Sequence, residues 1–322
     1  MMKAARPLHL PLGVLALALL GGSASAQSNY GVTVPPPPDR SVVLETAEVP
    51  HIRVVPVVSG LEHPWAMAFR RNGDVLVTER ELGQLRVIRD GQLMERTIDG
   101  VPEVYSGRLR AGLMDVALHP DDDAVVYLTY SKPVEWEGDQ GFTVALARGR
   151  LVGDALTDVR DLFVADGLDL GIAAARLLFA PDGTLFMSVG GSYVFAGTGD
   201  LAQDPGSHFG KLLRLTADGA VPPDNPFVGR AGYRPEIYSM GHRNQLGLAF
   251  HPETGDLWAT ENGPQGGDEA NIIQAGANYG WPRASYSREY AGGWVSSTPW
   301  LDAFESAEVL WWPSIAPSGM AF

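Results

Sequence analysis

The sequence predicts an all-β fold, and three observations support this prediction. The 322 residues include 38 glycines and 24 prolines, a frequency typical of many short strands joined by turns. Only 19% of the residues are charged, less than the roughly 25% of an average soluble domain. The third observation is a short pattern, an apolar triplet followed by a turn and a second apolar strand, that recurs along the chain.

The pattern occurs in four complete copies. In each copy, residues such as Pro, Asp, Asn and Gly set the turn and the flanking apolar residues favour strands, so each copy predicts a β-hairpin. Successive triplets lie 49, 61 and 71 residues apart, which leaves room for one four-stranded sheet per copy. The copies span residues 67–78, 116–129, 177–188 and 248–260.

Self-similarity at this period predicts a β-propeller, because each blade must stack on its neighbours to bury its faces. Residues 320–322 repeat the Met-Ala-Phe triplet of residues 67–69, so a fifth copy begins there and we expect the last blade to be incomplete. A pair of β-sandwiches is the alternative fold, and the wide, regular spacing of the copies argues against it.

The N-terminal segment predicts export. Lys3 and Arg6 precede an apolar run and a small-residue triplet at 24–26, which is the pattern of a signal peptide spanning residues 1–26. A transmembrane anchor is the alternative, but the apolar run is too short to cross a bilayer. We therefore expect a periplasmic or extracellular protein that is not inserted in a membrane once the signal is removed.

Two further segments follow the predicted signal peptide. Residues 27–50 contain four consecutive prolines amid polar residues and predict an extended linker, and residues 51–322 make up the predicted propeller domain. The chain has no cysteine, which excludes disulfides, thiolate metal sites and cysteine nucleophiles. Its formal net charge of −14 disfavours nucleic acid and anionic membranes as partners and leaves neutral substrates, cations and basic proteins.

Four loop segments carry the candidate chemistry, because functional residues of propellers lie on the loops between strands. The first, GHRNQLG at residues 241–247, offers the planar donor fork of Arg243 and the amide of Asn244. These groups suit carboxylate or quinone oxygens on a ligand. The alternative is a structural arginine that binds backbone carbonyl oxygens.

The second segment, ATENGPQGGDEANII at residues 259–273, interrupts a strand with three glycines and a proline. Glycines allow the backbone to approach a bound species closely, and Pro264 leaves its neighbourhood rich in carbonyl acceptors. Calcium binds several oxygens, many of them backbone carbonyls, and Asp268 and Glu269 could balance its charge. A tight turn that simply ends in a capped strand is the alternative.

The remaining two segments are less specific. Residues 276–290 place aromatic side chains beside glycines, which suits either a flat platform for a sugar or a planar cofactor, or ordinary core packing. Residues 202–215 form a polar loop that runs into a strand. His208 in this loop is either a catalytic base or a hydrogen-bonded structural residue.

Taken in order, these segments resemble the soluble PQQ-dependent sugar dehydrogenases of the glucose/sorbosone dehydrogenase family, most closely the aldose sugar dehydrogenase branch. The resemblance covers residues 63–322. It implies a six-bladed β-propeller that binds pyrroloquinoline quinone (PQQ) and calcium, oxidises the anomeric carbon of aldose sugars and passes the electrons to an external acceptor. The motifs are GHRN at 241–244, ENGPQGGDEAN at 261–271, NYGWP at 278–282 and AQDPGSHFGKLLRL at 202–215.

The resemblance also implies roles for particular residues. Arg243, Asn244 and Tyr290 would contact the quinone. Gly263 and Pro264 would offer carbonyl oxygens to its calcium. The ligands of a second, structural calcium would be Glu269 and Tyr279.

Two positions depart from the family pattern. In the family a histidine removes the hydroxyl proton while hydride passes to the quinone, and calcium with an arginine stabilises the charge that develops. Here Ile172 stands in place of that histidine, and Arg110 in place of a quinone-contacting glutamine. Because isoleucine cannot accept a proton, we expect a loss of roughly 100- to 10,000-fold in rate unless His208 or Asp204 supplies the base.

Two functions from different classes therefore remain. The first is an exported PQQ- and calcium-dependent oxidoreductase with a degenerate active site. The second is a non-catalytic propeller that keeps calcium for stability and binds a carbohydrate or a protein through its loops. Binding of PQQ that depends on calcium distinguishes the first function from the second.

Overall fold

The computed structural model describes the chain except for residues 1–37, 47–48, 107–110, 137–138, 169–173 and 192–197. The chain divides into two compact units, Met1–Pro56 and Val57–Phe322. In the first unit, β1 (Val42–Leu44) pairs antiparallel with β2 (Ile52–Val54). Part of the segment predicted as an extended linker, 27–50, is therefore a strand of a hairpin.

The predicted signal peptide, residues 1–26, lies outside the described residues. In the part of the chain that the structure describes, no helix has the length and apolar character needed to cross a membrane.

The second unit is built of β-sheets, as the sequence predicts. Its described strands form four sheets of four antiparallel strands, and within each sheet the strands lie in chain order. Every predicted hairpin corresponds to the first two strands of one sheet.

The first sheet contains β3 (Pro64–Phe69), β4 (Val75–Glu79), β5 (Gln84–Arg89) and β6 (Gln92–Leu93). The second contains β7 (Leu113–Leu118), β8 (Val125–Trp136), β9 (Asp139–Val152) and β10 (Ala155–Val164). The third contains β11 (Leu177–Phe179), β12 (Leu185–Val189), β13 (Lys211–Leu215) and β14 (Ile237–Met240), with the short 3-10 helix η1 (Thr198–Gln203) before β13. The fourth contains β15 (Gln245–Phe250), β16 (Leu257–Glu261), β17 (Asp268–Ile272) and β18 (Val309–Trp311).

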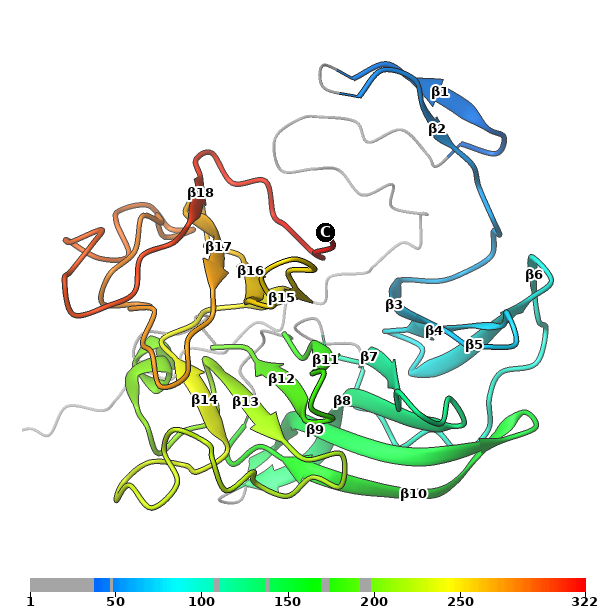
Figure 1. The fold of residues 1–322 in the computed structure, drawn as a ribbon, viewed down its shortest axis with the longest axis horizontal. Coiled ribbons are helices and arrows are strands. Elements are labelled where there is room, and N and C mark those ends of the chain that lie inside the picture. The colour runs from blue at the N-terminus through cyan, green and yellow to red at the C-terminus, as the bar shows by residue number, and fades with distance from the viewer. Residues whose placement is uncertain (1–37, 47–48, 107–110, 137–138, 169–173, 192–197) are drawn as a thin grey trace, which may run out of the picture. The chain divides into compact units, whose positions relative to one another are not determined.

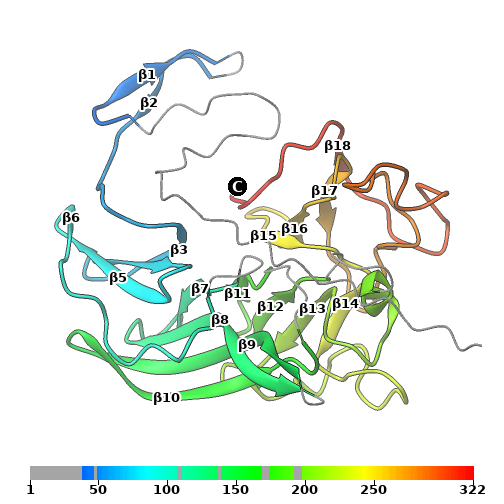
Figure 2. The ribbon, with the colours of Figure 1, turned by 180° about the vertical axis from the view of Figure 1, so that it is seen from behind.

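The four sheets stack in sequence order, which is the arrangement of propeller blades. The first strand of each sheet contacts the first strand of the next, from β3 to β7, from β7 to β11 and from β11 to β15. Figure 1 shows these strands on the inner side of the four sheets, and Figure 2 shows the same succession from behind. The predicted all-β propeller is therefore confirmed, with four blades in the described residues.

The blades are buried on both faces, because alternate residues of one strand pack against different neighbours. On β8, Val126 and Leu128 join the core shared with the first blade, whereas Tyr127 joins the core shared with the third. On β12, Met187 packs toward the second blade and Phe186 toward the fourth. All five side chains are at most 4% exposed. Burial on both faces explains why these strands read as near-continuous apolar runs.

A side-chain hydroxyl links consecutive blades. Thr129 accepts a hydrogen bond from the Asp115 amide (2.9 Å) on the first strand of its own blade. The same hydroxyl donates to the carbonyl of Ala175 (2.6 Å), just before the first strand of the next blade. Thr78 and Ser188 make the equivalent pair of bonds in the blades before and after. These bonds set the position of each inner strand against its neighbour.

The fifth copy of the pattern lies beside the fourth blade. Phe322 contacts His251 and Trp258, with ring centroids 4.6 and 5.9 Å apart. Phe179 makes the equivalent contacts with the second blade, to a turn histidine at 5.7 Å and a strand tyrosine at 5.1 Å. Phe322 therefore takes the place against the fourth blade that the first strand of the third blade takes against the second.

Replacing Thr129 by valine should lower the free energy of unfolding by about 1–3 kcal/mol, because a buried amide and a buried carbonyl lose their partner. The melting temperature should fall by roughly 2–4 °C for each kcal/mol. The control is Thr157→Val, since the exposed Thr157 hydroxyl donates only to the Arg150 carbonyl (3.2 Å) within one blade. Thermal melting of both variants tests the inter-blade bond, and equal shifts would contradict its importance.

Candidate functional site

Arg243 is held in place by the fourth blade. It lies between β14 and β15, and its backbone N–H donates to Oε1 of Glu261 (3.1 Å) at the end of β16. Its Nη1 donates to the carbonyl of Asn262 (2.6 Å), and its guanidinium lies over the ring of Trp281, 5.5 Å from the centroid. Arg243 is 5% exposed and lines a small cavity. It thus binds a backbone carbonyl, as the structural alternative predicts, and also faces a candidate ligand site.

The loop that carries Arg243 requires glycine at position 241. Gly241 has a φ of +76°, and a Cβ atom there would lie 2.0 Å from Oδ1 of Asn278. The Asn278 amide is bonded through both of its atoms to the amide of Gln203 (3.0 and 2.9 Å). Three of the four sequence motifs therefore meet at this loop.

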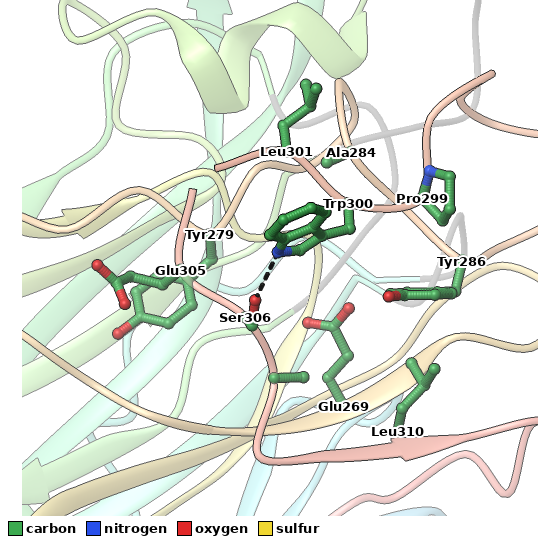
Figure 3. Close-up of a pocket in the computed structure, with 11 residues that line it drawn as sticks. Glu269, Tyr279, Ala284, Tyr286, Pro299, Trp300, Leu301, Glu305, Ser306 and Leu310 are labelled. Atoms are coloured by element: carbon green, nitrogen blue, oxygen red, sulfur yellow. Dashed lines mark hydrogen bonds between the residues drawn. The ribbon is translucent and has the colours of Figure 1, made fainter. Parts of the chain in front are cut away.

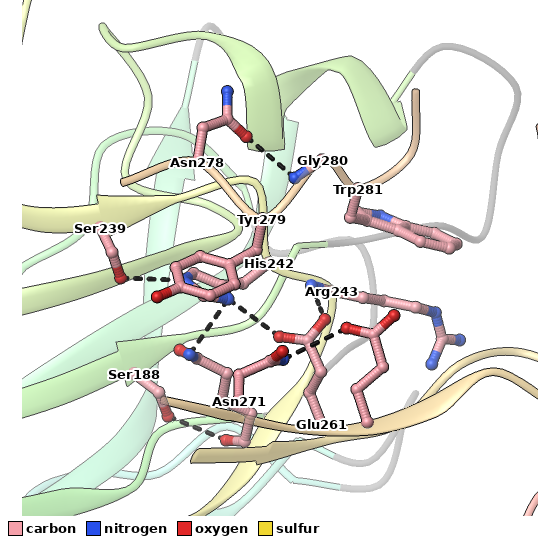
Figure 4. A network of polar contacts seen from close by, with 12 residues as sticks. Ser188, Ser239, His242, Arg243, Glu261, Asn271, Asn278, Tyr279, Gly280 and Trp281 are labelled. Atoms are coloured by element: carbon pink, nitrogen blue, oxygen red, sulfur yellow. Dashed lines mark hydrogen bonds and ion pairs between the residues drawn. The ribbon is translucent and has the colours of Figure 1, made fainter. Parts of the chain in front are cut away.

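His242 connects the same loop to Glu261 through buried hydrogen bonds (Figure 4). Its Nδ1 lies 2.9 Å from Oε2 of Glu261, and its Nε2 lies 2.8 Å from Oγ of Ser239. Because a carboxylate only accepts, we assign the proton to Nδ1, and Nε2 then accepts from the serine hydroxyl. Ser239 is 0% exposed, so no substrate reaches its hydroxyl.

Close packing requires the glycines of the second motif. A Cβ atom on Gly263 would lie 2.2 Å from the carbonyl oxygen of Gly266 and 2.4 Å from Oγ of Ser287. Gly266 and Gly267 have φ angles of +75° and +69°, a conformation that strains other residues. The loop therefore folds back on itself and brings backbone oxygens close together.

Asp268 is not available to a cation, which corrects the expectation that it balances the charge of calcium. Its Oδ1 accepts from the Gly263 amide (2.9 Å). Its Oδ2 accepts from the Ser314 hydroxyl (2.5 Å) and from the amides of Ile315 (2.8 Å) and Ala316 (2.7 Å). The carboxylate is fully buried, and its bonds tie the segment after β18 to the glycine loop.

Glu269 belongs to a row of polar residues across the fourth blade. The strand register pairs Gln245 with Glu261 and Glu261 with Glu269, so the three side chains lie on one face. Burial and the charge of Glu261 raise the pKa of Glu269 to about 8, although the Asn271 amide donates to its Oε2 (3.2 Å). Two carboxylates opposite each other repel, and a cation here would relieve the repulsion.

Two cavities adjoin Glu269. The smaller has a volume of about 10 Å³, which suits one water molecule or one small ion, and Arg243, Glu261 and Asn262 are among its lining residues. The larger, about 90 Å³, includes Trp300 in its lining (Figure 3). Residues that line both cavities are Glu269, Tyr279 and Ala284. The two predicted ligands of a structural calcium, Glu269 and Tyr279, therefore face the same spaces.

The donor atoms near Glu269 are oxygens. Across the described residues, no three or more His, Cys, Asp or Glu side chains form a group that could hold a metal ion, so a cation would also need amide and backbone oxygens. The buried Oδ1 atoms of Asn262 and Asn271 have no hydrogen-bond partner in the described part of the chain, which is costly for a buried acceptor. Such oxygens fit a hard cation such as calcium better than a transition metal.

The predicted quinone contacts come together from two separate loops. The hydroxyl of Tyr290 lies 3.5 Å from Nη2 of Arg243, and Tyr290 is 61% exposed. Asn244, the next residue along the chain, is 3% exposed, and its Oδ1 has no partner among the residues that the structure describes. Arg243 and Tyr290 therefore lie together, whereas Asn244 offers a buried acceptor at the next position of the chain.

The aromatic side chains between residues 276 and 290 divide between the core and the surface. Tyr279 is 6% exposed, stacks on His242 with centroids 4.6 Å apart, and donates its hydroxyl to the Ile272 carbonyl (2.6 Å). Trp281 is also buried, whereas Tyr286 and Tyr290 are exposed. Core packing therefore accounts for the first two residues and not for the last two.

The two candidate bases named from the sequence lie in different surroundings. Nδ1 of His208 accepts from the Asp166 amide (3.1 Å), and its Nε2 donates to Oε1 of Glu236 (2.5 Å). His208 is 2% exposed, so the structural alternative is correct. Asp204 is exposed and closes a turn by accepting from the Gly206 amide (2.8 Å). Arg110 and Ile172, the two departures from the family pattern, lie outside the described residues.

Three further residues of the site, His242, Glu261 and Asn271, lie within the sequence motifs but were not predicted to have a role. Glu261 ends the strand-forming run that precedes the glycine loop, and Glu269 begins the run that follows it. Pairing these two runs as a hairpin would have placed the two carboxylates opposite each other. The partner of His242 had no comparable signal, because its ring could point to either side of the loop.

Most of the chain matches known proteins in sequence. Residues 61–322 match the sequence family described as Glucose / Sorbosone dehydrogenase. Aldose sugar dehydrogenase YliI of Escherichia coli (strain K12) is 38% identical over 275 residues, which cover 81% of this chain and 71% of that protein.

Two solved structures are similar along most of the chain. The soluble aldose sugar dehydrogenase of Escherichia coli in its apo form matches with a TM-score of 0.74 at 38% identity, covering 80% of this chain and 75% of that one. The PQQ-bound form of an aldose sugar dehydrogenase from Streptomyces coelicolor matches with a TM-score of 0.66 at 29% identity, covering 89% and 77%. The chain therefore belongs to the glucose/sorbosone dehydrogenase family.

Proposed function

We propose that this protein is an exported oxidoreductase that binds PQQ and calcium and oxidises the anomeric carbon of aldose sugars through a degenerate active site. The observation that carries the proposal is the meeting of Arg243, Glu269 and the unpaired oxygen of Asn262 around one small cavity. The aldose sugar dehydrogenases similar to this chain, one of them solved with PQQ bound, add support.

Arg243 would bind an anionic oxygen of PQQ. Its backbone is fixed by Glu261 and its guanidinium by the Asn262 carbonyl, so little conformational freedom is lost when a ligand arrives. Asn244 would accept a hydrogen bond from the ligand, and Tyr290 would flank it. PQQ supplies the two-electron acceptor for the hydride that leaves the sugar.

Calcium would be held by two groups of oxygens. The carbonyls of Gly263 and Pro264 would bind the ion next to the quinone, and Glu269 with Tyr279 would bind a structural ion. The repulsion between Glu261 and Glu269 supports a cation at the second place, since its charge would allow both carboxylates to ionise.

The substrate proton has no assigned acceptor, because the family histidine is replaced by Ile172. His208 does not replace it, since it is buried and both of its ring nitrogens are bonded. Unless the exposed Asp204 supplies the base, we expect turnover reduced by roughly 100- to 10,000-fold relative to a site with a base. An external acceptor would take the electrons from the reduced cofactor, outside the cytoplasm.

Ile172 also favours the second function, a non-catalytic propeller that keeps calcium for stability and binds carbohydrate or protein. In that case calcium should raise the melting temperature and PQQ should not.

Arg243→Ala should weaken binding of PQQ by roughly 10- to 100-fold, because charge-assisted hydrogen bonds are lost, with little change in melting temperature. Wild type should bind PQQ only when calcium is present. Arg230→Ala is the matched control, since the Arg230 guanidinium also stacks on an aromatic ring, 3.9 Å from the centroid of Tyr233. Calorimetric titration with PQQ, in calcium and in EDTA, measures these affinities. The same Kd with and without calcium, or the same Kd for Arg243→Ala and Arg230→Ala, would refute the assignment.

Glu269→Gln should abolish stabilisation by calcium and make the metal-free protein more stable at high pH. The folded state keeps a proton on Glu269 up to about pH 8 that the unfolded state loses near its ordinary pKa of 4.5. Stability of the metal-free wild type therefore falls as the pH rises through this window.

In EDTA, wild type and Glu269→Gln should melt alike near the lower end of the window, and Glu269→Gln should melt at the higher temperature above its upper end, by roughly 2–4 °C for each kcal/mol that the ionised Glu269 costs the wild type. Calcium should stabilise wild type more at high pH than at low pH. Glu308→Gln, an exposed glutamate near the same sheet, is the control and should behave as wild type. A calcium-induced rise in melting temperature at high pH that is the same for wild type and Glu269→Gln would show that Glu269 holds no ion.

Ile172→His should raise aldose oxidation by roughly 100-fold or more if the missing base limits the rate. The measurement is dye-coupled turnover with PQQ and calcium, and Ile172→Ala controls for a change in size alone. Equal turnover of the two variants would place the defect at Arg110 or elsewhere in the site.

A further inference from the structure

The two oxygens of Glu261 have different partners. Oε2 accepts from Nδ1 of His242 (2.9 Å), and Oε1 accepts from the backbone N–H of Arg243 (3.1 Å). One carboxylate therefore joins the side chain of one residue to the main chain of the next. Because Glu261 is 5% exposed, water does not replace either bond readily.

Glu261 needs such an anchor because of what lies opposite it. Its cross-strand partner is Glu269, and like charges in this position repel. Bonding to His242 draws Oε2 toward the loop between β14 and β15 (Figure 4). Both oxygens of Glu261 are thereby bonded to the loop that carries Arg243, although the residue also lines the smaller cavity, whereas Glu269 lines both cavities.

The position of Arg243 depends on this carboxylate. Its N–H is held by Glu261, and its carbonyl accepts from the Gly191 amide (2.5 Å) of the third blade. Its guanidinium reaches the carbonyl of Asn262, which directly follows Glu261 in the chain. A movement of the Glu261 side chain would therefore change where the arginine points.

Ser239 orients the imidazole. Its hydroxyl lies 2.8 Å from Nε2 of His242 and donates to it, because the carboxylate of Glu261 can only accept and therefore places the ring proton on Nδ1. With this tautomer the Gln245 amide, 3.1 Å from Nδ1, turns its oxygen rather than its nitrogen toward the ring, which also gives the buried Oε1 a partner. The order Ser, His, Glu is that of a hydrolytic triad, but a serine that is 0% exposed cannot attack a substrate. The chain of bonds can act only by fixing geometry.

We propose that His242 is a positioning residue that, through Glu261, holds Arg243 in the orientation that binds the anionic cofactor. The inference rests on the proposed function for the identity of that cofactor. His242 does not touch the ligand, so its effect is on affinity through the placement of Arg243.

Two substitutions separate positioning from packing. His242→Asn keeps an amide donor near the place of Nδ1, whereas His242→Gln keeps one near the place of Nε2 and loses the bond to Glu261. The matched control is His208→Asn, because His208 is equally buried and also bonded to a glutamate, Glu236, in the third blade.

The measurements are residue-resolved hydrogen exchange of the Arg243 amide by NMR and the Kd for PQQ in calcium. His242→Gln should speed exchange and weaken PQQ binding by roughly tenfold or more, and His242→Asn should change both by less than about threefold. His208→Asn should lower the melting temperature and leave both values unchanged. Ser239→Ala, which hardly alters packing, should change the exchange rate and the Kd in the same direction as His242→Gln. It replaces His242→Gln in the test if that variant does not fold.

Equal effects of His242→Asn and His242→Gln, or a Ser239→Ala protein that matches wild type in amide exchange, would overturn the positioning role. If wild type itself binds no PQQ, the proposed function fails, whereas the amide exchange still decides whether His242 holds Arg243.

Discussion

The hydrogen bond between the hydroxyl of Ser188 and the carbonyl of Gln245 (3.0 Å) is the contact on which the candidate site depends. It repeats the bond that links the other described blades, but here it ends at the first residue of β15, two residues after Arg243. A few residues beyond Ser188, Gly191 donates to the carbonyl of Arg243. The third blade thus holds the loop that the fourth blade uses, and stacking of the blades and placement of the arginine are one constraint.

The fourth blade adds the charge. Its register places Glu261 opposite Glu269, an arrangement that is unfavourable unless the two carboxylates have different partners. The Glu261 carboxylate accepts hydrogen bonds from the His242 ring and the Arg243 amide. Glu269 instead faces small cavities and buried oxygens that have no partner in the described residues. The structure thus separates a carboxylate that orients from a carboxylate that suits a cation, and both functions proposed for the protein use the second.

Much of the fold could be predicted because its signals are local. Each hairpin carries its own turn residues and strand-forming runs, so four copies of one pattern were enough to predict stacked four-stranded sheets. The motif loops were found for the same reason, since glycines with positive φ, such as Gly241, leave a mark in the sequence. The linker was predicted less well, because pairing of Val42–Leu44 with Ile52–Val54 depends on a partner strand rather than on composition.

The order of the blades and the residue types in the motif loops follow from the sequence alone. Which of these loops meet, and which of their side chains stay available to a ligand, follows from the folded structure. Asp268 and Glu269 are adjacent carboxylates, yet Asp268 accepts hydrogen bonds from residues 314–316 and Glu269 does not. His208 and His242 are both buried histidines bonded to glutamates, but only the glutamate of His242 also holds Arg243. Such differences arise from contacts between residues far apart in the chain, which no local pattern encodes.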